Sequence, residues 1–80
     1  MFKNKNDGRN NLCGDKIRTL RQSGKEKLSQ RALADKMQLI GIDVDKNAIQ
    51  RIECGKRFVT DIELRAFAQI FGVTLDELVR

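Results

Sequence analysis

The sequence predicts an all-α protein, a compact bundle of five short helices that forms one small domain. Three observations predict this class. Apolar residues recur at spacings of three, four and seven positions, which places them on one face of a helix. Glycines follow these segments, and residues that can cap a helix precede most of them. Ile42 and Val44 alternate with charged residues, but the stretch 41–45 is too short to be more than a loop.

The chain starts with a polar segment ahead of the predicted domain. Residues 1–11 are rich in asparagine and lysine and hold almost nothing apolar beyond Phe2. Such a segment buries too little apolar surface to order itself. We therefore expect a flexible N-terminal tail over 1–11 and a folded domain over 12–80. A charged tail of this kind is either simply solvated or an arm that touches nucleic-acid phosphates.

The first two predicted helices carry apolar stripes and are each followed by a glycine. The first runs from about Asp15 to Gln22 and ends at Gly24. Ser29 is a suitable N-cap for the second, which stops at Gly41. The residues expected to pack are Cys13, Ile17 and Leu20 with the first helix, and Leu33, Ala34, Met37 and Ile40 with the second.

The third predicted helix, from Lys46 to about Cys54, has two contrasting sides. Asp45 is a suitable N-cap, and Gly55 follows the helix. Advancing about 100° per residue separates the side chains into an inner and an outer side. The inner side holds Ala48, Ile49, Ile52 and Glu53. The outer side holds Asn47, Gln50, Arg51 and Cys54, with Lys46 on its flank at the first turn.

Two capping boxes predict the starts of the last two helices. Thr60 with Glu63, and Thr74 with Glu77, would each satisfy two backbone N–H groups that have no partner within the helix. Gly72 closes the fourth helix. The apolar residues expected inward are Leu64, Phe67, Ala68 and Phe71 in the fourth helix, and Leu75, Leu78 and Val79 in the fifth.

The composition argues against catalysis and against a metal site. The chain has no histidine, so it lacks the usual general base and the commonest metal ligand. Cys13 and Cys54 match no zinc spacing, and two free thiols of a cytoplasmic protein are favoured over a disulfide or a metal site. No glycine-rich phosphate loop, cluster of carboxylates or membrane-length apolar run is present. We therefore expect no enzyme, no cofactor and no membrane partner.

Positive charge is concentrated in the first part of the chain. The net charge is +5, of which residues 1–31 carry +6, residues 32–57 carry +1 and residues 58–80 carry −2. Such a distribution suits a face that binds a polyanion and a separate face for a partner. Asparagine and glutamine can pair with the adenine edge, and arginine with the guanine edge. An ordinary solvated surface remains the alternative explanation of the polar third helix.

Four segments together resemble the lambda-repressor/Cro-like (XRE) helix-turn-helix family, over Gly14 to Val79. The segment GDKIRTLR resembles the family's first helix, and LSQRALADKM its scaffold helix. The segment AIQRIECGKR resembles the recognition helix, and LRAFAQIFGVTLDELV the closing helices. The stretch MQLIGIDVDK makes the connection about four residues longer than the commonest family pattern. It either lengthens the second helix or enlarges the turn.

The resemblance implies sequence-specific binding of double-stranded DNA by a prokaryotic or phage transcriptional regulator of the repressor type, which reads the major groove with the helix 46–54. Base contacts are expected from Asn47, Gln50 and Arg51. Phosphate contacts are expected from Gln30, Lys46, Lys56 and Arg57. The resemblance also implies a structural ion pair between Arg21 and Glu53, which agrees with the inward position of Glu53, because a buried glutamate needs a partner.

The expected partner is a DNA operator, bound by a homodimer on a palindromic site, because a single short helix makes few base contacts. The mildly acidic, apolar C-terminal end either holds that dimer or is simply part of the core; its apolar residues are Phe71, Val73, Leu75 and Val79. The alternative function is a protein-interaction module on the same fold, antitoxin-like or an adaptor subunit.

Overall fold

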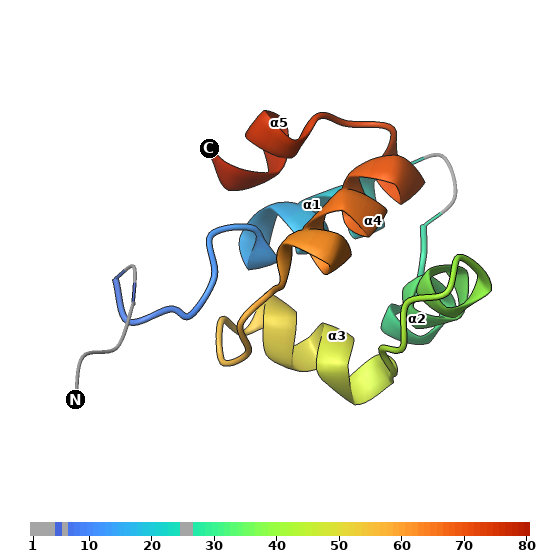
Figure 1. Ribbon diagram of the computed structural model, residues 1–80, viewed down its shortest axis with the longest axis horizontal. Coiled ribbons are helices and arrows are strands. Elements are labelled where there is room, and N and C mark those ends of the chain that lie inside the picture. The colour runs from blue at the N-terminus through green and yellow to red at the C-terminus, as the bar shows by residue number, and fades with distance from the viewer. Residues whose placement is uncertain (1–4, 6, 25–26) are drawn as a thin grey trace.

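The computed structural model describes residues 5, 7–24 and 27–80, and over these residues the chain is all-helical. The elements are α1 (Gly14–Ser23), α2 (Gln30–Leu39), α3 (Lys46–Glu53), α4 (Asp61–Phe71) and α5 (Leu75–Val79). Figure 1 shows α3 along the lower edge beside α2, with α1 and α4 above them and α5 at the top. This confirms the predicted five-helix all-α class. None of the helices in the described part of the chain is long and apolar enough to cross a membrane.

Helices α2 to α5 begin where the capping residues predict. Ser29 accepts a hydrogen bond from the Ala32 N–H at 3.0 Å, and Asp45 accepts one from the Ala48 N–H at 2.8 Å. Both predicted capping boxes are present, at the starts of α4 and α5. At the end of α4, Gly72 adopts φ 66°, a left-handed conformation that favours glycine.

The core lies between α1, α2, α3 and α4 and is closed by α5. Its members share near-complete burial; those with no exposed surface are Ile17, Leu33, Met37, Ile49, Ile52, Phe67 and Leu78. Two residues expected inward lie outside. Ile40 is 40% exposed because it has left the helical conformation at the end of α2. Leu75 is 48% exposed because it opens a short helix that enters the core through Leu78.

The longer connection between α2 and α3 is packed against the bundle. Helix α2 continues to Leu39, and residues 40–45 form the turn. Val44 in this turn is 2% exposed and belongs to the core. The Gln38 Nε2 group donates to the Val44 carbonyl at 2.9 Å, which ties the turn to the end of α2. The turn is therefore held against the domain, and it supports the start of α3.

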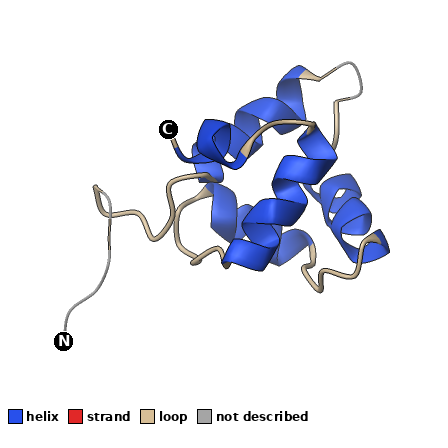
Figure 2. Cartoon of the chain, turned by 45° about the horizontal axis from the view of Figure 1, so that its top comes forward, coloured by secondary structure: helices blue, strands red, loops and turns tan. Residues whose placement is uncertain are grey.

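Residues 9–11, which the sequence placed in the tail, make contact with the domain. In both views the chain before α1 passes the loop that follows α3 (Figures 1 and 2). Asn11 Nδ2 donates to the Arg57 carbonyl at 2.8 Å, and the Asn10 N–H donates to the Gly55 carbonyl at 2.7 Å. The expectation of a flexible tail over 1–11 does not fit these three residues. Residues 1–4 and 6 of that tail lie outside the described part.

Candidate nucleic-acid interface

Helix α3 presents a polar side to solvent and an apolar side to the core. Ile49 and Ile52 have no exposed surface, and Glu53 is 1% exposed. The outward side chains are all exposed: Lys46, Asn47, Gln50 and Arg51. The two sides expected from the helical spacing are therefore confirmed. The outward side offers amide and guanidinium groups, which can donate and accept hydrogen bonds along the helix.

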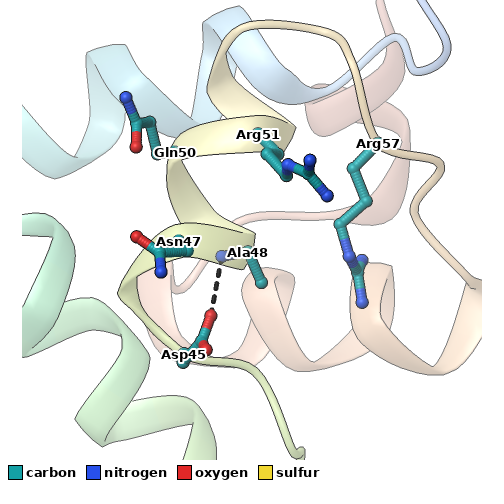
Figure 3. A pocket seen from close by; sticks show the side chains of 6 residues that line it. All are labelled: Asp45, Asn47, Ala48, Gln50, Arg51 and Arg57. Atoms are coloured by element: carbon teal, nitrogen blue, oxygen red, sulfur yellow. Dashed lines mark hydrogen bonds between the residues drawn. The ribbon is translucent and has the colours of Figure 1, made fainter.

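A concave surface, which encloses a volume of about 520 Å³, lies along this polar side. Its lining residues are Asp45, Asn47, Ala48, Gln50, Arg51 and Arg57. Figure 3 shows Asn47 and Gln50 projecting from successive turns on one flank, with Arg51 and Arg57 on the other. The surface thus brings together the three side chains expected to contact bases, and it places Arg57 beside them.

The carboxylate of Glu53 joins three helices beneath this surface. Arg21 donates to it twice, from Nε to Oε2 at 2.7 Å and from Nη2 to Oε1 at 2.9 Å. Gln30 Nε2 donates to Oε1 at 3.2 Å, and Arg18 Nε lies 3.4 Å from the same oxygen. Burial raises the pKa of Glu53, but the hydrogen bonds from Arg21 and Gln30 outweigh it and leave that pKa below its ordinary value.

Two of the four residues expected to contact phosphates already have protein partners. Gln30 is half-buried at the start of α2, and one N–H of its amide is used by Glu53. Arg57 donates from both terminal nitrogens to the two oxygens of Glu63, each at 2.9 Å. Lys46 and Lys56 are exposed at the two ends of α3. The two lysines are therefore more available for phosphate contacts than Gln30 and Arg57.

The Arg57–Glu63 pair was missed by sequence reasoning, which assigned Glu63 to the capping box alone. Glu63 is 8% exposed and also accepts from the Thr60 N–H at 3.0 Å. The hydrogen bonds from Arg57 lower the pKa of Glu63 below its ordinary value. The six-residue spacing of the pair follows no helical period, because a loop separates the two residues. A phosphate contact by Arg57 would have to compete with this carboxylate.

Of the remaining candidate residues, Cys54 lies at the end of α3 and the others lie away from its polar side. Cys13 is buried and Cys54 is exposed at the end of α3, and both are free thiols. At the C-terminal end Leu75 is exposed, whereas Phe71, Val73 and Val79 are half-buried against the core. Among the described residues, no group of three or more His, Cys, Asp or Glu side chains is placed to hold a metal ion.

One comparison with known proteins gives a match. A family model described as helix-turn-helix matches residues 17–78, which is most of the chain and includes α2, the turn and α3. Searches against curated proteins and against solved structures gave no match.

Proposed function

Because the chain belongs to the lambda-repressor-like (XRE) helix-turn-helix family, a family of DNA-binding regulatory domains, we propose that it is a sequence-specific, repressor-like transcriptional regulator of prokaryotic or phage type. The observation that carries this proposal is the polar outer side of α3, with Asn47, Gln50 and Arg51 exposed on it. A catalytic role has no support in the chemistry of these groups, which are donors and acceptors rather than nucleophiles or bases.

In the proposed complex α3 lies in the major groove and α2 crosses the DNA backbone. The major groove admits a helix and displays a distinct hydrogen-bond pattern for each base pair. Asn47 and Gln50 suit adenine, and Arg51 suits guanine, in bidentate pairs. These three side chains share one side of an eight-residue helix, so they would meet neighbouring base pairs.

Phosphate contacts would fix the position of α3 in the groove. Lys46 lies at the N-terminus of α3, where the helix dipole also favours an anion, and Lys56 lies just beyond its C-terminus. The second N–H of the Gln30 amide, at the start of α2, is available to another phosphate. Arg57 is a lesser contributor, because its guanidinium is paired with Glu63.

A homodimer on a palindromic operator would double these contacts. Each good bidentate base contact contributes about 1–3 kcal/mol, which is little for one short helix. Two copies with half-sites about 34 Å apart would read two successive turns of one DNA face. The exposed Leu75, with the half-buried residues around it at the C-terminal end, supports that end as the dimer contact.

The test is selection of bound duplexes from a random pool, followed by titration of the enriched duplex at several salt concentrations. We expect a palindromic consensus and an affinity that falls steeply with salt, because lysine contacts to phosphates release counterions. An unenriched pool, or retention that salt does not affect, would contradict the proposal.

Exposed apolar side chains favour one second candidate, a protein-interaction module on the same fold. Leu39 is 85% exposed, Ile62 66% and Phe58 58%. Residues of this kind occur singly on many surfaces, but they also mark contact sites for other proteins. The duplex selection separates the two functions, because an adaptor would enrich no sequence.

A further inference from the structure

Three consecutive residues ahead of α1 hydrogen-bond to the end of α3. We call Arg9, Asn10 and Asn11 the N-terminal clasp. Arg9 Nη2 donates to the Glu53 carbonyl at 2.8 Å, and Asn10 Nδ2 donates to the Lys56 carbonyl at 3.0 Å. Asn11 Nδ2 donates to the carbonyls of Ile52 and Arg57, at 3.0 and 2.8 Å. The Asn10 N–H reaches the Gly55 carbonyl at 2.7 Å.

The clasp hydrogen-bonds to the Glu53 carbonyl, at the end of α3 where a helix leaves its last carbonyls without helical partners, and to carbonyls of the loop that follows. It also adds a second donor to the Ile52 carbonyl, which already accepts from the Gly55 N–H. Within α3 and its exit, the Gln50 carbonyl accepts from the Cys54 N–H, and the Arg51 carbonyl accepts from the Lys56 N–H. The carbonyls that the clasp reaches belong to Ile52, Glu53, Gly55, Lys56 and Arg57. Arg9 also brings a positive charge to the negative end of the helix dipole.

Two glycines let the clasp approach this closely. Gly55 has φ 80°, and a Cβ atom there would lie 2.7 Å from Cζ of Arg9, so the guanidinium lies against bare backbone. A Cβ atom on Gly14 would overlap the Ile52 carbonyl oxygen. The first turn of α1, the clasp and the exit of α3 are therefore in direct contact, with no side chain between them.

The clasp and the proposed DNA contacts share the same short segment. Lys56 is the exposed cation at the exit of α3. Its carbonyl accepts a hydrogen bond from the Asn10 side chain, and its N–H donates to the Arg51 carbonyl. Gln50 and Arg51 lie on the last turns of the same helix. Any loosening of residues 54–57 would therefore let Lys56 move relative to the side chains that face the bases.

We propose that Arg9, Asn10 and Asn11 are positioning residues for DNA reading, which hold the exit of α3 so that Lys56 keeps a fixed place relative to Gln50 and Arg51. This inference rests on the proposed function. A cation held in place before binding loses less conformational freedom when it contacts a phosphate, and it also fixes the register of the helix in the groove. The clasp thus acts on DNA affinity without touching bases.

The test uses Asn11, because its amide has two separable tasks. Its Nδ2 group donates to the exit of α3, whereas its Oδ1 atom accepts from the Gly14 N–H at 2.8 Å. Asn11→Asp keeps an acceptor for Gly14 but removes both donors to the carbonyls. Asn10 is less suitable, because its Oδ1 atom is buried without a partner among the described residues.

Hydrogen exchange and DNA titration would be measured on the whole chain carrying Asn11→Asp or Asn11→Ala. Thr19→Ala is the matched control, because it removes an exposed side-chain hydrogen bond, from Thr19 Oγ1 to the Asp15 carbonyl, in α1 and outside the proposed DNA and dimer contacts. We expect both Asn11 variants to speed exchange of the Gly55 and Lys56 amides about tenfold relative to α4 amides. At a temperature where all variants are folded, they should weaken binding of the selected duplex about tenfold, and the control roughly twofold at most.

The outcomes separate the clasp from the proposed function. If Asn11→Asp exchanges and binds like the wild type, Asn11 serves only α1 and the inference is wrong. Faster exchange at the exit of α3 with unchanged DNA affinity would leave the clasp as a purely structural cap, which also overturns the inference. A wild-type chain that enriches no duplex overturns the proposed function, and the role of the clasp in DNA reading with it.

Discussion

Gln50 lies on α3 and Lys56 lies just after it, and we expect their substitution to cause different defects in DNA binding. Gln50→Ala removes an exposed amide expected to read a base, so it should change which sequence is preferred. Lys56→Ala removes an exposed charge at the exit of the helix, so it should weaken binding to all sequences alike and flatten the salt dependence. Titration of each variant against the selected duplex and its single-base variants would check this. A uniform loss from both substitutions would show that the base-reading side has been assigned wrongly.

Arg21 and Glu53 form an ion pair in which the Glu53 side chain has no exposed surface and the Arg21 side chain is 11% exposed. Arg21→Ala should lower the free energy of unfolding by about 3–5 kcal/mol, because it removes the main partner of a buried carboxylate. Chemical denaturation would measure this loss. Arg80→Ala, which breaks an exposed pair with Asp76, is the control and should change little. Equal stability of the Arg21 variant and the wild type would remove the pair from the stability argument.

At the scale of the elements, helix starts were predictable because their signals are local. The capping pair Thr60 and Glu63 lies three residues apart, and it located the start of α4 from sequence alone. The orientation of α3 followed equally from the spacing of Ile49 and Ile52. The prediction that Ile40 packs inward was wrong, because it extended the helical spacing one residue past the last turn of α2.

Contacts between distant segments carried no such local signal. Asn11 and Arg57 are 46 residues apart, and nothing in the pattern around either residue indicates that they pair. The polar composition of residues 1–11 indicated a tail, because hydrogen bonds from asparagine to backbone carbonyls add no apolar periodicity. The part of the candidate site that the helical spacing of α3 defines was therefore predictable, whereas the part that closes it at the exit of α3 was not.

The turn between α2 and α3 offers a prediction at the same scale. Val44 is 2% exposed, so Val44→Ala should leave a small cavity and lower the free energy of unfolding by about 1–3 kcal/mol. Leu39→Ala, at a position 85% exposed, is the control and should be close to neutral. Denaturant midpoints of the two variants would check this. If Val44→Ala changed the denaturant midpoint as little as Leu39→Ala, the longer connection would be a loose loop that does not support α3.

The dependence of stability on pH is a property of the whole molecule, and its acid side follows from Glu53 and Glu63. Both carboxyls have pKa values below the ordinary one in the folded chain, so the folded state binds their protons less readily than the unfolded state. Their contribution is therefore complete above about pH 5 and is lost as the pH falls through the folded pKa values. Without histidine, the chain should show a nearly flat stability between pH 6 and 8. Thermal melts across this range would check it, and a transition near pH 6.5 would contradict it.

The alkaline side depends on Cys13, whose burial raises the pKa of its thiol to about 11. The sign is opposite to that of the carboxyls, because the folded state now holds a proton that the unfolded state releases. The contribution is complete below the unfolded value near 9 and declines as the pH rises toward 11, by roughly 2–3 kcal/mol in all. Denaturation of the wild type and of Cys13→Ala at pH 8 and pH 10.5 would isolate this term. The alanine variant is less stable at pH 8, because it leaves a small cavity, but its stability should fall less between the two pH values. Parallel losses in both proteins would assign the alkaline decline to other groups and would mean that the thiol is not shielded from water in solution.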